Sequence, residues 1–115
     1  MHPHATYRHI ADDYHRKLLV QHAIRKGIEQ ARGDFFYALL ADGLDDAGLD
    51  LCAHEVWAAY HRQVTFDYPQ FAETLFIHAY RAAYRRHLED VARGQHTDPL
   101  ALVRTIEVGF GLVEQ

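Results

Sequence analysis

Residues 69–93 read PQFAETLFIHAYRAAYRRHLEDVAR and hold more apolar side chains than one face of a helix needs. Pro69 stands where a first-turn proline is favoured and Gly94 where a glycine ends a helix, so the stretch predicts one helix over 69–93. Helical spacing sorts its apolar residues into two stripes that lie roughly 120–140° apart. The first consists of Phe71, Ala72, Leu75, Ala79, Ala82 and Ala83, and the second of Ile77, Tyr80, Tyr84, Leu88 and Val91.

A helix that is apolar on two sides is either central in its own domain or gives one side to another chain. A chain of 115 residues has few other helices with which to enclose this one. We therefore predict that the second stripe, with an arginine rim, docks a protein partner or a second copy of the chain. Two alternatives stay open: both stripes are intramolecular core, or the second lines a groove for a small ligand. The predicted partner-binding residues are Ile77, Tyr80, Arg81, Tyr84, Arg85, Leu88 and Val91.

Helix signals recur along the rest of the chain, whereas the alternating patterns typical of strands do not. Gly33 is placed to end a first helix, Asp34 to cap a second, and Asp98-Pro99 to open the last. The fold class we expect is all-α, a compact bundle of about five helices in one domain over residues 1–115. The predicted helices span approximately 5–32, 34–42, 47–64, 69–93 and 98–110.

The predicted first helix changes its apolar face halfway along. Its first half carries one stripe and its second half another, rotated by roughly 100°. Either the helix bends at Leu18-Leu19-Val20, or its two halves pack against different neighbours, the first half then reaching a second protomer. The two stripes are Tyr7, Ile10, Ala11, Tyr14 and Leu18, then Val20, Ile24, Gly27, Ile28 and Ala31.

Composition narrows the possible functions. No apolar run approaches the 18 or more residues of a membrane span, and the stretch from Met1 to Leu18 is too polar for a signal peptide. Cys52 is the single cysteine, which excludes an internal disulfide framework and suits a reducing cytoplasm. Serine is absent, which excludes serine hydrolases. We therefore expect a cytoplasmic protein.

Motifs that carry chemistry are missing. The chain has ten histidines, but none recur at the His-x-x-x-His spacing that commonly binds a metal on a helix. The acidic loop over 42–48 lacks the oxygen ligands of a calcium loop and is better explained by turns and helix capping. Cys52 falls on the apolar face of its helix, where a thiol is inert. We expect no metal, no cofactor and no enzymatic activity.

Charge is strongly segregated beneath the net value of -4: residues 1–33 carry a net +3 and residues 34–55 a net -6. The predicted function is that of a small interaction protein, a subunit, adaptor or inhibitor of a larger bacterial-type assembly, itself a homo-oligomer. One alternative is a helical subunit of a nucleoprotein complex that contacts the phosphate backbone of RNA or DNA. Another is a histidine-rich metal or pH sensor. The basic residues available for nucleic acid are Arg16, Lys17, Arg25, Lys26, Arg86 and Arg93.

Overall fold

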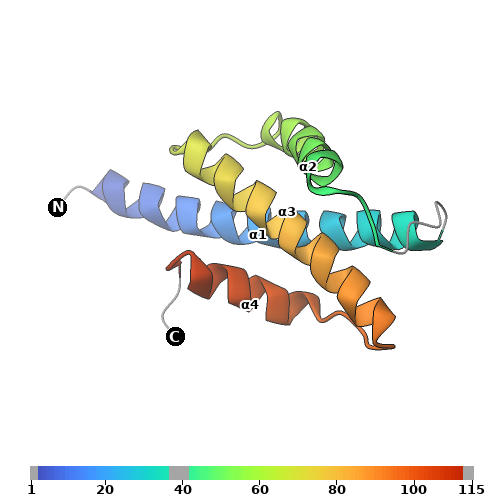
Figure 1. The fold of residues 1–115 in the computed structure, drawn as a ribbon. Helices are drawn as coiled ribbons and strands as arrows, with labels where there is room; N and C mark the ends of the chain where they lie inside the picture. Colours follow the sequence, from blue (N-terminus) through green and yellow to red (C-terminus); the bar gives the residue numbers. More distant parts are fainter. Residues whose placement is uncertain (1–2, 37–41, 113–115) are drawn as a thin grey trace.

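The computed structural model describes the backbone of residues 3–36 and 42–112 and the side chains of residues 14–35 and 42–112. This part of the chain contains four helices and no strand (Figure 1). It confirms the all-α class and measures 55 × 30 × 18 Å. Within the described ranges, the helices are all too short or too polar to cross a membrane. In chain order the helices are α1 (Pro3–Phe36), α2 (Asp46–His61), α3 (Pro69–Ala92) and α4 (Pro99–Gly109).

The predicted count of five helices is wrong for the described residues, and the error lies at Gly33. Helix α1 does not end there but continues to Phe36, so Asp34 belongs to α1 rather than capping a second helix. A glycine inside a helix costs only about 1 kcal/mol relative to alanine, which the packing of a long helix can outweigh. The rest of the predicted second helix, residues 37–41, lies outside the described residues. The other predicted helices start and end within three residues of the observed ones.

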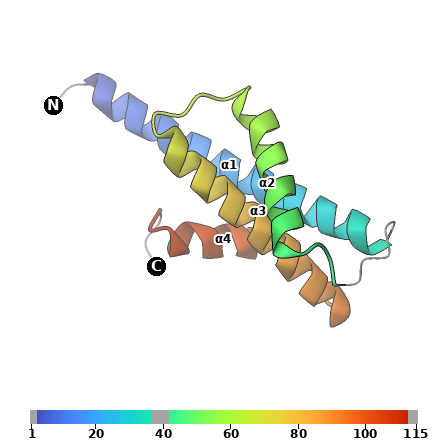
Figure 2. The same ribbon diagram turned by 45° about the horizontal axis from the view of Figure 1, so that its top comes forward.

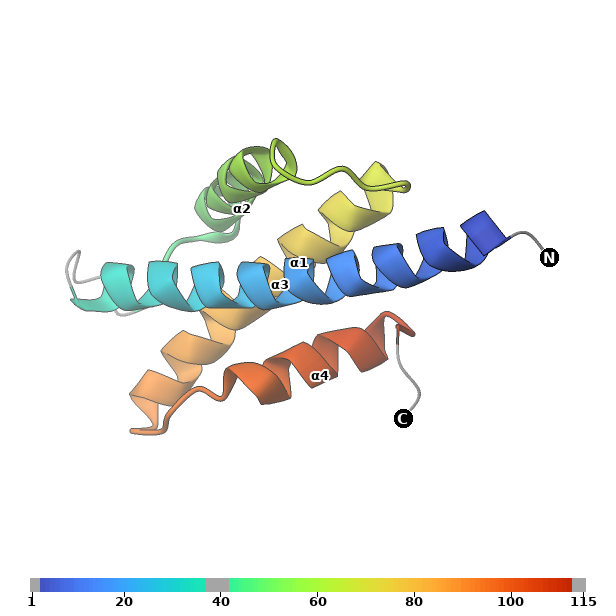
Figure 3. The same cartoon turned by 180° about the vertical axis from the view of Figure 1, so that it is seen from behind.

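Helix α3 is the central element of the fold. It crosses α1, and the contact between these two helices is the most extensive one in the molecule (Figures 1 and 3). Helix α2 packs on α3, and α4 packs mainly on α1 (Figure 2). Both apolar stripes of α3 therefore contribute to the core, with Leu75 and Ala79 of the first and Tyr80 and Tyr84 of the second fully buried. The two-sided pattern reflects this central position.

The backbones of α1 and α3 approach closely at Gly27. A Cβ atom at this position would clash with the backbone oxygen of Tyr80 and would lie 3.0 Å from Ala83 Cβ. The second stripe of α1 is buried around this crossing, with Ile24 and Ala31 almost inaccessible. A glycine is therefore required on α1 where the two helices cross.

The apolar stripe of α1 changes face without a break in the helix, and the two stripes differ in burial. Helix α1 runs without interruption through Leu18, Leu19 and Val20 (Figure 3). Leu19 and Val20 are fully buried, whereas Tyr14 and Leu18 of the first stripe are exposed. The described part of the first stripe is thus less covered than the second stripe.

Candidate functional site

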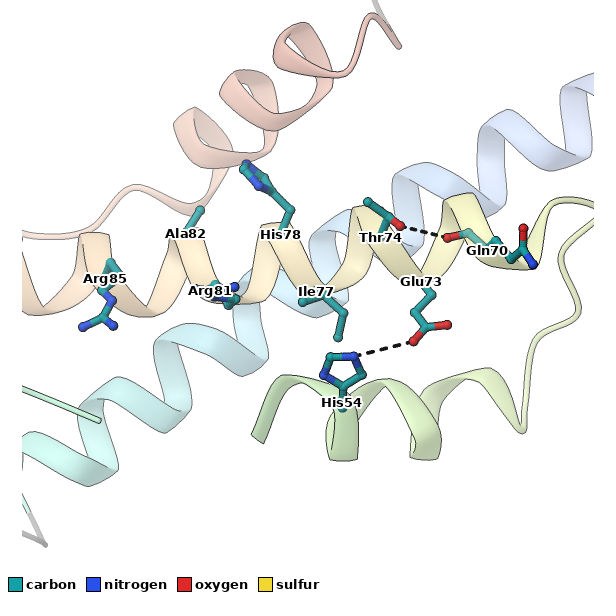
Figure 4. A pocket seen from close by; sticks show the side chains of 9 residues that line it. All are labelled: His54, Gln70, Glu73, Thr74, Ile77, His78, Arg81, Ala82 and Arg85. Atoms are coloured by element: carbon teal, nitrogen blue, oxygen red, sulfur yellow. Dashed lines mark hydrogen bonds and ion pairs between the residues drawn. The ribbon is translucent and has the colours of Figure 1, made fainter. Parts of the chain in front are cut away.

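An open groove of about 710 Å³ runs along α3 and is lined by residues of α3 and by His54 of α2 (Figure 4). Proline at the first position of α3 and the central packing of the helix hold this face in place. Ile77 is half-buried on its floor, Arg81 and Arg85 extend from the same helix face, and His54 of α2 forms one wall. The arrangement offers an apolar centre with charged side chains around it.

Only three of the seven predicted partner-binding residues line this groove: Ile77, Arg81 and Arg85. Tyr80 and Tyr84 are fully buried, so their assignment to a partner surface is wrong. The physical reason is the crossing at Gly27, which turns this part of α3 against α1. The two tyrosines are core residues.

Leu88 and Val91, the last two predicted residues, are half-buried outside the groove. The loop before α2 covers Leu88: Gly43 has a φ of +76°, and a side chain there would clash with Leu88 and lie 2.8 Å from the Tyr84 hydroxyl. A glycine both permits this backbone conformation and leaves the space that the two side chains occupy. The loop therefore covers Leu88, which does not line the groove.

Two arginines of the groove pair with the acidic start of α2. Arg85 donates a hydrogen bond of 2.7 Å from Nη2 to Asp46 Oδ1. Arg81 lies 3.7 Å from both Asp46 Oδ1 and Asp50 Oδ1. The Asp46 side chain is 82% exposed, and exposed ion pairs contribute only about 0–1 kcal/mol. These ion pairs orient the two arginine side chains but contribute little to the stability of the fold.

His54 and Glu73 complete the polar rim. The Nδ1 atom of His54 lies 3.4 Å from Asp50 Oδ2, and its Nε2 atom lies 3.7 Å from Glu73 Oε1 (Figure 4). Sequence reasoning missed these residues as part of the site, together with Asp46. The signal that could have indicated them is the segregation of charge, because the acidic segment 34–55 folds against basic residues of α3.

The acidic loop before α2 also shows the capping chemistry that its sequence predicts. Asp45 is the N-cap of α2, and its Oδ1 atom accepts a hydrogen bond of 2.8 Å from the Gly48 amide. This contact satisfies one of the free amides at the start of the helix. The predicted role of the loop in capping is therefore confirmed.

Tyr84 connects three separate segments inside the core. Its hydroxyl donates a hydrogen bond of 2.6 Å to Oδ2 of the buried Asp34 on α1 and accepts one of 2.8 Å from the Leu44 amide. Burial and the bond to Asp34 raise the pKa of Tyr84 to about 12. The Tyr80 hydroxyl is also buried but has no hydrogen-bond partner among the described residues, and burial raises its pKa. Tyr84 therefore joins three segments by hydrogen bonds, whereas Tyr80 contributes to the core through its ring.

The basic residues proposed for nucleic acid are dispersed around the molecule. Arg25 lies beside the groove between α1 and α4, whereas Lys26 lies beside the groove between α1 and α2 and pairs with Glu29 at 3.4 Å. Arg86 donates a hydrogen bond of 3.2 Å from Nε to the buried Asp90, near the start of α4. These three bases therefore belong to different sides of the structure and do not form one stripe along a phosphate backbone.

The described side chains include no cluster of three or more histidine, cysteine, aspartate or glutamate residues that could hold a metal ion. Cys52 is half-buried in α2, and burial, then the charges of Glu55 and Asp34, raise the pKa of its thiol. A thiol with a raised pKa is a poor nucleophile at neutral pH. The groove on α3 therefore remains the best candidate site.

Comparisons with protein-family models, with curated proteins and with solved structures find no match for this chain.

Proposed function

We propose that the chain is a small non-enzymatic interaction protein that docks through the groove on α3, and that the groove faces the same groove of a second copy. The observation that carries this proposal is the order of residues on the exposed face of α3. Glu73, Ile77 and Arg81 follow one another at intervals of four, so they share one face of the helix. A helix face with an acid, an apolar residue and a base in this order is complementary to an identical face that runs in the opposite direction.

A two-fold axis at Ile77 makes this complementarity explicit. When two α3 helices face each other antiparallel, Glu73 of each copy lies opposite Arg81 of the other, and the two Ile77 side chains meet between them. Two-fold dimers are the commonest oligomers, and their contacts are reciprocal in this way. An apolar centre with arginine beside it is also the composition typical of interaction hot spots.

Arg81 and Glu73 on this face make only weak ion pairs within the chain. The contacts of Arg81 to Asp46 and Asp50, and of Glu73 to His54, are all 3.7 Å long. The side chains of Arg81 and Glu73 are both about 40% exposed, so these pairs contribute little in water. Between two copies the same charges lose contact with solvent and interact more strongly.

A charge exchange tests the proposal. We expect the native chain to be a dimer by light scattering and both Glu73→Arg and Arg81→Glu to be monomers, because each substitution brings like charges together. An equimolar mixture of the two variants should form the dimer again, since every contact across the axis then joins an arginine to a glutamate. Matched controls are Glu89→Arg and Arg62→Glu, which change the same charges at exposed residues outside the groove.

Circular dichroism of each variant checks that the helices are intact. A native chain that stays monomeric at high concentration overturns the proposal of a second copy. So does a mixture of the two variants that remains monomeric, because another partner on the groove, unlike a second copy, would not restore a dimer in the mixture. If the two control variants dissociate to the same extent, the interface lies elsewhere on the molecule and the proposal is wrong.

A further inference from the structure

Helices α2 and α4 are peripheral to the pair formed by α1 and α3, and a histidine lies at the junction of each with this pair. His22 of α1 packs against α2, and His87 of α3 contacts the segment that leads into α4. We propose that these two histidines make the attachment of α2 and α4 sensitive to acid: the neutral rings hold the two helices in place, and protonation releases them.

One contact of His22 requires the neutral form of its ring. Its ring stacks on Tyr60 of α2 with centroids 4.6 Å apart. The Nη2 atom of Arg25 lies 3.2 Å from its Nδ1 atom. A guanidinium has only donors, so Nδ1 must carry a lone pair, which places the single ring proton on Nε2. A second proton on Nδ1 would face the guanidinium and break this contact.

The charges around His22 also oppose a second positive charge. Arg25 and Lys26 on α1 disfavour protonation, and Glu29 on the same helix only partly compensates for them. Glu55 of α2 lines the same groove, and α3 contributes the apolar ring of Phe76, 6.2 Å away. Burial, followed by the charges of Arg25 and Lys26, lowers the pKa of His22.

His87 is more deeply buried, with 7% of its surface exposed. Its Nδ1 atom lies 2.8 Å from the Thr97 hydroxyl, just before α4, while its Nε2 atom is buried with no partner among the described residues. The charged groups that face it are Arg32 from α1 and Asp90 from α3. Burial, then the charge of Arg32, lowers the pKa of His87. A neutral ring whose Nδ1–H group donates to the Thr97 hydroxyl leaves Nε2 without a proton, whereas a protonated ring would bury an Nε2–H group that has no acceptor among the described residues.

The direction of the pH effect follows from these pKa values. The ordinary histidine pKa is 6.5, and both folded-state values lie below it. The released form therefore binds protons more readily than the packed form. The stability that the neutral rings contribute is complete above about pH 6.5 and is lost as the pH falls below that value towards the folded-state pKa.

Hydrogen exchange measured residue by residue tests this inference on the native chain and, so that dissociation of a dimer does not interfere, also on Glu73→Arg, which the proposed function predicts to be a monomer. We expect amides of α2 and α4 to lose protection between about pH 7.5 and pH 5, after correction for the intrinsic pH dependence of exchange, while α1 and α3 stay protected near their crossing. His22→Gln should remove the pH effect on α2, and His87→Gln the effect on α4. The exposed His96, changed to Gln, is the matched control.

Titration of the histidine ring signals by NMR provides a second measurement that needs no variant to fold. His22 and His87 should titrate below pH 6.5. The inference is overturned if His22 and His87 titrate at or above pH 6.5, if α2 and α4 keep their protection to about pH 5, or if the glutamine variants lose protection with the native pH dependence.

Discussion

Replacing Gly27 with alanine is expected to lower the free energy of unfolding by about 3 kcal/mol, the upper end for an overpacked core. The new Cβ would clash with the backbone oxygen of Tyr80 and would lie 3.0 Å from Ala83 Cβ and 3.2 Å from the Tyr84 amide nitrogen. Two of these atoms belong to the backbone of α3, so no side-chain rotation relieves the clash. The helices themselves would have to move apart, and the central contact of the fold would loosen.

Gly33→Ala is the matched control, because it makes the same change in the same helix. A Cβ atom at Gly33 meets nothing within 4 Å. Alanine is favoured over glycine in a helix by about 1 kcal/mol, so this variant should be slightly more stable than the native chain. Urea denaturation of the three proteins measures both effects. A Gly27→Ala variant as stable as the native chain would contradict the close approach of α1 and α3.

The order and class of the elements could be predicted because their signals are local. Pro69 at the start of α3 and the Asp98-Pro99 pair before α4 act within one turn of helix, so the sequence alone shows where these helices begin. The prediction at Gly33 was wrong because α1 continues through this glycine. The packing of a long helix can outweigh the cost of a glycine inside it. Gly27, by contrast, lies within an apolar stripe, the position expected where another backbone packs closely.

The candidate site was less predictable because burial depends on residues that are distant in the sequence. Periodicity placed Tyr84 on an apolar stripe, but only the fold brings Asp34, fifty residues earlier, to its hydroxyl. The pairing of Arg85 with Asp46 joins residues 39 positions apart, and the segregation of charge along the sequence does not show which acidic and basic residues meet. Ile77 of the second stripe lines the groove. The same stripe could not show that α1 covers Tyr80 and Tyr84.

Replacing Tyr84 with phenylalanine is expected to cost about 3 kcal/mol, because it removes a hydroxyl that serves two buried groups. The change leaves Oδ2 of Asp34 without its 2.6 Å donor and the Leu44 amide without its 2.8 Å acceptor. Gln30 donates to the other carboxylate oxygen, Oδ1. A buried carboxylate with one oxygen unpaired is strongly destabilising, and the loop before α2 loses its contact with the core.

Tyr80→Phe, four residues earlier in the same stripe, should be neutral or stabilise the fold by up to about 1 kcal/mol, because it removes a buried hydroxyl that has no partner among the described residues. Both variants keep the ring, so packing is the same and only the hydrogen bonds differ. Thermal and urea denaturation of the two variants and the native chain therefore isolate the contribution of the Tyr84–Asp34 bond. Equal losses in both variants would mean that this bond contributes nothing specific, and that Tyr84 stabilises the fold through its ring alone.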